Sequence, residues 1–430
     1  MTPNDWSRIK AFYRHQIETS LLPFWQRAVD RERGGMFTCF SNDGRQLRST
    51  DKFIWSQGRM VWLWARLAEA MERRWLSGDA SRFLAEGEAA ARFVERHAIL
   101  PSGEVAYFVT QEGEPLETIP GAGYAPSFFS DCFVIVGWAE LARVTGDRHW
   151  YERGLNLWQH LNARLAAGKA PSEPYPVWPG WMQHAQPMVL LNVAETLADA
   201  ADRLDGGESA GRLRESWRAL GSAVWQTFVD GDTVLEMVPA TGSDRDTLVG
   251  RHVNPGHAIE DMGFILRMAQ RAGEPGWVGR AAAGLKRAFE LGWDSQYGGI
   301  LRFVDRDGGP PRGTLGGGRY EALVRDSWDT KLWWPHGETL YATLLASYLT
   351  NDTEFDTIYS MTERYVFSVF PNPDPTVGEW IQIRDRAGRP VEQVPALPVK
   401  DPFHLLRSFL LIGDLATAAE ASPAASPPSR

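Results

Sequence analysis

The segment GGILRFVDRDG, residues 298–308, decides the fold because its pattern returns elsewhere in the chain. Each copy starts at a glycine, alternates apolar and polar residues and ends at a second glycine, as a short β-hairpin does. The copies begin about 65–80 residues apart, or twice that distance, which predicts an internal repeat. The further copies are GGMFTCFSNDG (34–44), GEVAYFVTQEG (103–113), GEWIQIRDRAG (378–388) and a slightly longer one from Gly231 to Gly242.

Helical periodicity fills the chain between these segments. Tight links such as Thr145-Gly146-Asp147 and Thr350-Asn351-Asp352 join the predicted helices in pairs. An open solenoid would need polar capping repeats, which the sequence lacks. We therefore expect an all-α fold, an (α/α)6 barrel (toroid) with short β-hairpins between helix pairs. The predicted helices span 6–30, 53–76, 79–98, 126–145, 148–166, 186–204, 208–229, 256–273, 275–292, 335–350, 352–368 and 402–419.

Composition indicates how far the domain extends, which partners are excluded and where in the cell the protein is expected. We expect a single barrel domain over 1–418 and a disordered tail over 419–430, which is rich in Ala, Ser and Pro. The net charge of -9, without a basic run, argues against nucleic acid and anionic membranes as partners. Only Cys39 and Cys132 are present, and neither a signal peptide nor a membrane span is visible. A cytoplasmic location is therefore expected.

In such a barrel the second helix of each pair lines the inner wall, so the inner N-termini converge on one rim. The first turns at this rim carry chemically active side chains. A histidine there feels the positive end of the helix dipole, which disfavours its cation and leaves a neutral base. We expect acid/base or supporting roles for His257, His404, Arg59, Glu260, Glu338 and Arg407, and substrate contacts from Trp55, Gln57, Met188, Asn192, Trp334 and His336.

Each of these residues also has a simpler explanation. A single first-turn histidine is more often a capping or packing residue than a catalyst. His257 and Glu260 could be two metal ligands, but no HExxH motif or Cys/His cluster completes a set. No nucleotide-binding glycine pattern follows a predicted strand. We expect neither a metal nor a cofactor. A glycoside hydrolase would need two carboxylates, and Glu260, Glu338, Asp131 and Asp326 are available.

Five of these segments resemble the N-acylglucosamine 2-epimerase family, which includes cellobiose 2-epimerases and aldose–ketose isomerases acting on mannose or sulfoquinovose. They are KFIWSQGRMVW (52–62), PMVLLNVAE (187–195), NPGHAIE (254–260), KLWWPHGE (331–338) and DPFHLLR (401–407). The resemblance implies that His257 and His404 are the two acid/base groups and that Arg59 lies near the substrate carbonyl. It also implies supporting roles for Glu260, Glu338 and Arg407, and an (α/α)6 fold.

The resemblance predicts a sugar 2-epimerase that inverts C2 of an aldose through a cis-enediolate, with N-acylglucosamine/N-acylmannosamine or glucose/mannose as the pair. Family isomerases tend to carry histidine where this chain has Asn192, which favours the epimerase. The alternatives are an aldose–ketose isomerase of the mannose/fructose type, a glycoside hydrolase and a non-catalytic sugar-binding protein. The expected partner is a small monosaccharide or disaccharide. Nucleotide activation and the oligomeric state, a homodimer included, stay open.

Overall fold

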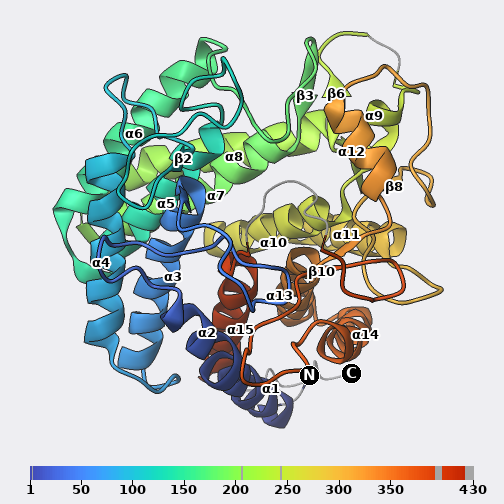
Figure 1. Cartoon of the computed structure of the whole chain (residues 1–430). Coiled ribbons are helices and arrows are strands. Elements are labelled where there is room, and N and C mark those ends of the chain that lie inside the picture. Colours follow the sequence, from blue (N-terminus) through green and yellow to red (C-terminus); the bar gives the residue numbers. More distant parts are fainter. Residues whose placement is uncertain (2, 205–206, 243–244, 393–399, 422–430) are drawn as a thin grey trace.

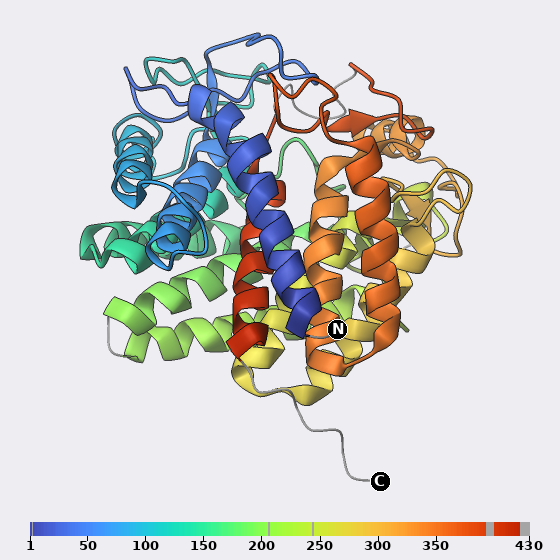
Figure 2. The same cartoon turned by 90° about the horizontal axis from the view of Figure 1, so that it is seen from below.

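The computed structural model describes residues 1, 3–204, 207–242, 245–392 and 400–421. Its helices form two concentric layers around a central axis (Figures 1 and 2). Neighbouring inner helices pack in chain order, and the last packs against the first, so the ring closes. The inner helices are α3 (Ile54–Glu72), α5 (Phe128–Thr145), α7 (Ala185–Leu204), α10 (Pro255–Ala272), α13 (Trp333–Thr350) and α15 (Phe403–Ala421).

Each inner helix is covered by one outer helix or helical stretch. The first outer stretch is continuous from α1 through a π-helical turn, η1, into α2. The predicted (α/α)6 barrel is thus confirmed. The outer elements are α1 (Pro3–Gln16), η1 (Ile17–Leu21), α2 (Leu22–Arg27), α4 (Ala80–His97), α6 (Arg148–Ala166), α8 (Glu208–Thr227), α11 (Pro275–Gly292) and α14 (Thr353–Val369).

Three details differ from the predicted element boundaries. Two short helices, α9 (Leu248–Arg251) and α12 (Arg319–Ser327), lie in connections where none was predicted. Helix α15 runs to Ala421, so residues 419–421 of the predicted tail are helical. The rest of that tail lies outside the described residues.

The two layers differ in burial, as their positions require. Helix α5 is buried from Phe128 to Ala142 because it is surrounded by helices on all sides. Helix α3 approaches it so closely that a Cβ on Gly58 would lie 2.3 Å from the carbonyl oxygen of Phe133. Any side chain at Gly58 would therefore push the two backbones apart. Outer helix α4, in contrast, buries one face only.

Short antiparallel strands tie the N-terminal ends of neighbouring inner helices together. In each pair, one strand directly precedes an inner helix and its partner lies in the connection before the next one. Ser127 and Ser172 form an equivalent bridge for α5, and the Lys400 amide donates to the Thr38 carbonyl before α15. The pairs are β1 (Lys52–Phe53) with β2 (Phe108–Val109), β3 (Trp181–Gln183) with β6 (Met237–Pro239), β7 (His252–Val253) with β8 (Val304–Asp305), and β9 (Lys331–Leu332) with β10 (Ile383–Arg384).

The predicted hairpins are present inside the connections, mainly as isolated bridges. Such bridges join Val29 to Met36, Ile99 to Val105, Trp293 to Ile300 and Pro371 to Trp380. A further hairpin is formed by β4 (Val229–Asp230) and β5 (Thr233–Val234). The pairing between successive connections was not predicted, because it joins segments that are distant in sequence.

Buried lysines reinforce these ties. Lys52 donates to the Asp30 carboxylate at 2.8 Å and to the carbonyls of Gly34 and Gln111. Lys331 is held in the same way: its ammonium lies 3.2 Å from the Asp294 carboxylate and donates to the carbonyls of Gly298 and Arg386. Both lysines are fully buried. Each ammonium thus joins two connections and replaces its lost hydration with fixed acceptors.

The opposite end of the barrel, where the inner helices finish, is rich in ion pairs. Arg143 bonds to Glu69 and Glu140, and Arg66 pairs with Asp414. Basic side chains there offset the negative ends of the helix dipoles. None of the described helices is both long and apolar enough to span a membrane.

We predict that Asp30→Asn lowers the free energy of unfolding by about 3 kcal/mol, because it leaves the buried Lys52 ammonium without its counter-charge. Urea-induced unfolding at pH 7 measures the change. Glu392→Gln, which removes the exposed partner of Arg48, should cost less than about 1 kcal/mol. Adding Lys52→Met to Asp30→Asn should recover part of the loss. Equal stability of Asp30→Asn and wild type would contradict the proposed role of the buried pair.

Candidate active site

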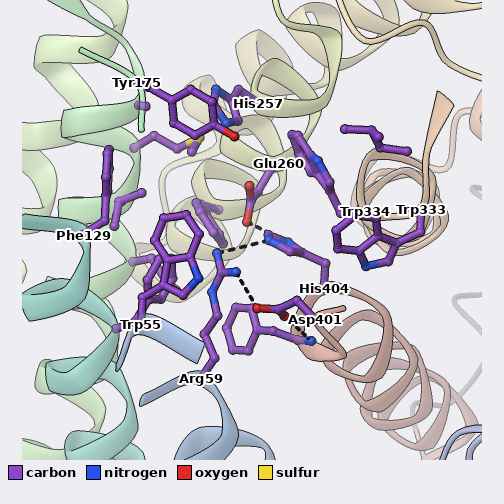
Figure 3. A pocket seen from close by; sticks show the side chains of 18 of the residues that line it. Trp55, Arg59, Phe129, Tyr175, His257, Glu260, Trp333, Trp334, Asp401 and His404 are labelled. Carbon is purple, nitrogen blue, oxygen red and sulfur yellow. Dashed lines mark hydrogen bonds and ion pairs between the residues drawn. The ribbon is translucent and has the colours of Figure 1, made fainter. Parts of the chain in front are cut away.

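A cavity opens at the end of the barrel where the inner helices begin, and every inner helix contributes to its lining (Figure 3). Its wall is mostly aromatic and apolar, with a few polar groups between, which suits a sugar ring. The inner helices supply Trp55, Arg59, Phe129, Phe133, Met188, Asn192, His257, Glu260, Trp334 and His404, and the connections add residues such as Tyr175, Arg302 and Asp401.

His404 stands in the first turn of α15 and is held at both ring nitrogens. Its Nδ1 lies 2.9 Å from Glu338 Oε1, and its Nε2 lies 3.3 Å from Nη2 of Arg59. Arginine only donates, so Nε2 accepts the bond and the proton sits on Nδ1. The two partners therefore fix the orientation of the His404 ring at the cavity, with Nδ1 towards Glu338 and Nε2 towards Arg59.

Two buried carboxyl groups lie beside His404, and their pKa values shift in opposite directions. Arg407 places Nη1 2.9 Å from each oxygen of Glu338. Although burial opposes it, Arg407 and His404 together lower the pKa of Glu338. Burial raises the pKa of Glu260, His404 opposes this effect, and the Glu338 charge adds to it. Glu338 is thus the anion that holds His404.

Glu260, Glu338 and His404 are also close enough to resemble a metal site. They are the only three metal-ligating side chains found grouped this tightly among the described residues. However, Arg407 already supplies the positive charge beside Glu338, and His404 Nδ1 is engaged by the same carboxylate. The donor set is therefore built for hydrogen bonding and fits a cation poorly. His257, the other ligand considered from the sequence, is not part of this group.

His257 has a carboxylate of its own. It is the third residue of α10, and its Nδ1 lies 2.9 and 3.0 Å from the two oxygens of Glu236. Its Nε2 has no hydrogen-bond partner among the described side chains. Although burial opposes it, His257 and His184 together hold the pKa of Glu236 well below its usual range. Glu236 is therefore an anion that fixes the His257 ring.

A second buried histidine supports Glu236 from behind. His184 Nε2 lies 2.7 Å from Asp261, and its Nδ1 is 3.9 Å from Glu236. Burial lowers the pKa of His184, but Asp261 and Glu236 outweigh it and raise the pKa to about 9. The chain His257–Glu236–His184–Asp261 thus alternates bases and acids through the interior.

Arg59 is fixed by an ion pair and by aromatic rings. Its Nη1 lies 3.0 Å from Asp401 Oδ2, and its guanidinium carbon sits 3.9 Å above the Phe133 ring. The other Asp401 oxygen accepts the Phe403 amide and so caps α15. Asp401 therefore links the position of Arg59 to the helix that carries His404.

Trp334 separates the two cavity histidines. Its ring centroid lies 5.3 Å from that of His257 and 5.3 Å from that of His404. The rings are tilted to one another, and Figure 3 shows the three side chains on one wall of the cavity. The indole thus fixes the spacing of the imidazoles and offers an apolar face.

The structure brings most of the predicted site residues together. Trp55, Arg59, Met188, Asn192, His257, Glu260, Trp334 and His404 line the cavity. Glu338 and Arg407 stand behind His404. Gln57 and His336 were expected to contact substrate, but the structure places both outside the cavity and fully buried.

Gln57 and His336 occupy equivalent positions in the repeat. Each is the fourth residue of its inner helix. The Gln57 amide exchanges hydrogen bonds of 2.8 and 2.9 Å with the backbone of Met36. His336 Nε2 accepts the Ile300 amide at 2.8 Å, and its Nδ1 donates to the Leu332 carbonyl. Their shared role is to anchor the backbone that follows a Gly-Gly pair.

Sequence reasoning missed the residues that the connections contribute. Glu236 and Arg302 carry no periodic signal, because their neighbours in space are far away in sequence. Asp261, which holds His184, lies within α10. His184 supports Glu236 from behind, at 3.9 Å. Asp401 stands directly before a predicted inner helix, and that helix-capping position was the signal that could have found it.

The carboxylates that a glycoside hydrolase would need are not paired in the cavity. Asp131 is buried against Arg164, 2.9 Å away, and Asp326 is on the surface, paired with Arg325. Of the described carboxylates that line the cavity, Asp401 is engaged by Arg59 and Glu260 lies beside His404. The site is thus organised around histidines.

A double-walled helical barrel with carboxylate-backed histidines in an aromatic cavity defines a carbohydrate-converting enzyme of the acid/base type. The family model described as N-acylglucosamine 2-epimerase (GlcNAc 2-epimerase) matches residues 35–408. The chain therefore belongs to the N-acylglucosamine 2-epimerase family. It is a sugar 2-epimerase, an enzyme of the isomerase class.

Curated relatives agree with this assignment, and solved structures share the fold. The chain is 30% identical over 406 residues to the N-acylglucosamine 2-epimerase of Bos taurus, covering 92% of this chain and 88% of the bovine protein. The human enzyme is 29% identical over 412 residues, covering 94% and 89%. The cellobiose 2-epimerase structure from Bacillus thermoamylovorans shares the fold at TM-score 0.74 and 16% identity, covering 95% and 99% of the two chains. A D-mannose isomerase structure does so at 0.72 and 16%, covering 94% and 97%.

We predict that His336→Gln keeps sugar turnover, because glutamine is the residue that the equivalent position already uses. Activity should stay within about threefold of wild type, far from the hundredfold loss typical of acid/base groups. Burial lowers the pKa of His336 to about 3, so its contribution to stability is present above pH 6.5 and is lost as the pH falls towards 3.

Glutamine does not titrate, so this variant should lose less stability than wild type between pH 7 and pH 4.5. Thermal unfolding at the two pH values measures the difference. A strong loss of turnover in a folded His336→Gln protein would return His336 to the active site.

Proposed function

We propose that this protein inverts C2 of an aldose, of the N-acylglucosamine/N-acylmannosamine or glucose/mannose type: one histidine removes the C2 proton and the other delivers a different proton to the opposite face. One observation carries the proposal. His257 and His404 each bind a buried carboxylate through Nδ1, at 2.9 Å from Glu236 and Glu338, which leaves Nε2 as the reactive atom of both rings. Glu236 and Glu338 would stabilise each imidazolium as it forms.

The reaction needs an open-chain sugar, because the C2 proton is acidic only when the C1 carbonyl can accept the resulting charge. Arg59 donates towards His404 Nε2 across 3.3 Å, so it stands beside the atom that would take the proton. C1 and C2 are bonded neighbours, and this spacing suits a guanidinium at the C1 oxygen with a base at C2. Arg59 would then stabilise the cis-enediolate.

Inversion also requires a group on each face of C2. His257 and His404 belong to different inner helices and lie on either side of Trp334, each 5.3 Å from its ring. One ring would remove the proton and the other would return one to the opposite face. An aldose–ketose isomerase would instead deliver the proton to C1, and a single histidine would suffice.

The proposal extends to the setting of the enzyme. Cys39 and Cys132 are buried free thiols, and burial raises the pKa of Cys39 to about 11. Inert thiols and the absence of a candidate membrane span among the described helices support a cytoplasmic enzyme that acts on a small sugar. Asn192 lines the cavity, and asparagine at this position of the PMVLLN segment, where family isomerases tend to carry histidine, supports the epimerase over the isomerase.

We predict that His257→Asn and His404→Asn both abolish net epimerisation, since each variant keeps a base on one face of C2 only. In D2O, followed by NMR, one variant should slowly exchange C2 of the gluco sugar and the other that of the manno sugar, without interconversion. Wild type should deuterate C2 of the product and accumulate no ketose. Ketose as the main product would replace the epimerase with the isomerase. Full activity in either variant would remove that histidine from the mechanism.

We also predict that Glu236→Gln lowers kcat by about a hundredfold, with a smaller change in KM, because His257 loses the anion that orients and charges it. Steady-state kinetics at several pH values measures this. The pH dependence of the remaining activity should shift as well, which a purely structural role would not cause. Glu72→Gln, on the protein surface, is the matched control. Wild-type kcat in a folded Glu236→Gln variant would contradict the paired-carboxylate mechanism.

A further inference from the structure

The buried lysines and arginines of the described residues differ in what compensates their charge. Buried lysines and arginines pair with a carboxylate in nearly every case, as Lys52 does with Asp30. Arg384 instead donates to three main-chain carbonyls. Among the described residues, only Arg302 is a buried cation with neither arrangement. The carboxylate-paired cations are Lys52, Arg59, Arg164, Lys331, Lys400 and Arg407.

Arg302 has neutral neighbours and lines the catalytic cavity. It is 5% exposed, and its Nη1 donates to the Ser327 hydroxyl at 3.0 Å. The phenol of Tyr175, another cavity residue, is its other side-chain partner, and the Phe303 ring lies 5.0 Å from its guanidinium carbon. Burial lowers the pKa of Arg302, and no described carboxylate lies near enough to reverse this. The guanidinium nevertheless stays charged at neutral pH.

A buried charge without a counter-ion costs free energy, so a ligand group of opposite charge would be stabilised beside such a cation where it lines a cavity. A guanidinium is suited to carboxylate, sulfonate and phosphate because its planar fork matches their paired oxygens. We propose that Arg302 binds an anionic group carried by the aldose substrate. This inference rests on the proposed epimerase function, and it narrows the substrate class to acidic sugars.

The position of Arg302 indicates which end of the sugar carries the charge. Figure 3 shows Tyr175 towards His257 and away from Arg59. Since Arg59 is assigned to the C1 oxygen, Arg302 faces the far end of the open chain. The anionic group is therefore expected at C6, as a carboxylate or as a phosphate or sulfonate substituent. A hydroxyl at C6 would leave the charge of Arg302 uncompensated.

The experiment compares neutral sugars with their anionic counterparts by C2 deuterium incorporation in D2O. The panel pairs mannose with mannuronate and with mannose 6-phosphate, and N-acetylmannosamine with its 6-phosphate. Wild-type kcat/KM should be at least about tenfold higher for an anionic member, and Arg302→Gln should lower that value by about a hundredfold. The same variant should lower kcat/KM of the neutral sugars by a smaller factor, so that the ratio of anionic to neutral kcat/KM falls by at least about tenfold. The two anion types show which acidic group is preferred.

Controls separate charge recognition from folding. Arg302→Lys keeps a positive charge and should retain part of the anion preference, whereas Arg306→Gln removes a surface arginine paired with Asp246 and should change nothing. Inorganic sulfate should compete with a neutral sugar in wild type. If Arg302→Gln does not fold, sulfate competition and Arg302→Lys still decide the question. The proposal would be overturned if sulfate did not compete, or if wild type preferred neutral sugars. It would also be overturned if Arg302→Gln lowered kcat/KM equally for anionic and neutral sugars.

The outcomes also distinguish this inference from the proposed function. If no sugar of the panel exchanges its C2 proton, the epimerase proposal fails. An increase in melting temperature with inorganic phosphate, present in wild type and lost in Arg302→Gln, would still support the anion site. If neutral sugars exchange well and anions neither react nor compete, the epimerase stands and the anion site is wrong.

Discussion

The antiparallel ties between successive connections are the constraint on which the rest of this structure depends. Each tie joins the residues that precede one inner helix to the segment that leads into the next, as Lys52–Phe53 does with Phe108–Val109. The inner helices therefore start at a common level and expose their first turns to one cavity. Lys52 and Lys331 hold these ties from inside with buried ion pairs, so the cavity rim is stiff where chemistry requires a fixed geometry.

Two histidines of the active site are each held by a buried carboxylate, and the two carboxylates come from different kinds of element. His404 receives Glu338 from the neighbouring inner helix, whereas His257 receives Glu236 from a connection. In both cases the carboxylate is buried and its pKa is lowered by the cations around it, despite the cost of burial. Each imidazole therefore has a carboxylate partner at Nδ1, while Nε2 of His404 accepts a hydrogen bond from Arg59 and Nε2 of His257 has no such partner among the described side chains.

Most buried charged side chains are paired with a side chain of opposite charge, so a buried cation without such a partner is informative. Asp401 neutralises Arg59 while capping α15, and Arg407 neutralises Glu338. Arg302 alone among the buried cations of the described chain faces neutral hydroxyls. The inner helices thus carry the two histidines proposed as acid/base groups, and a connection carries Arg302, which we propose binds an anionic substituent of the substrate.

The sequence by itself determined the barrel, the inner and outer helices and the rim that holds the site. Helical periodicity and the glycine-bounded segments are local signals, and a closed ring is the packing that buries every inner helix. It also pointed to His257, His404 and Arg59, which stand near the starts of predicted inner helices and line the cavity. Sequence could not separate them from Gln57 and His336, which share that position but turn into the wall to anchor backbone amides. Only the tertiary structure decided which first-turn side chains face the cavity, and it alone brought Glu236, His184 and Arg302 to them, because these contacts join connections that are remote along the chain.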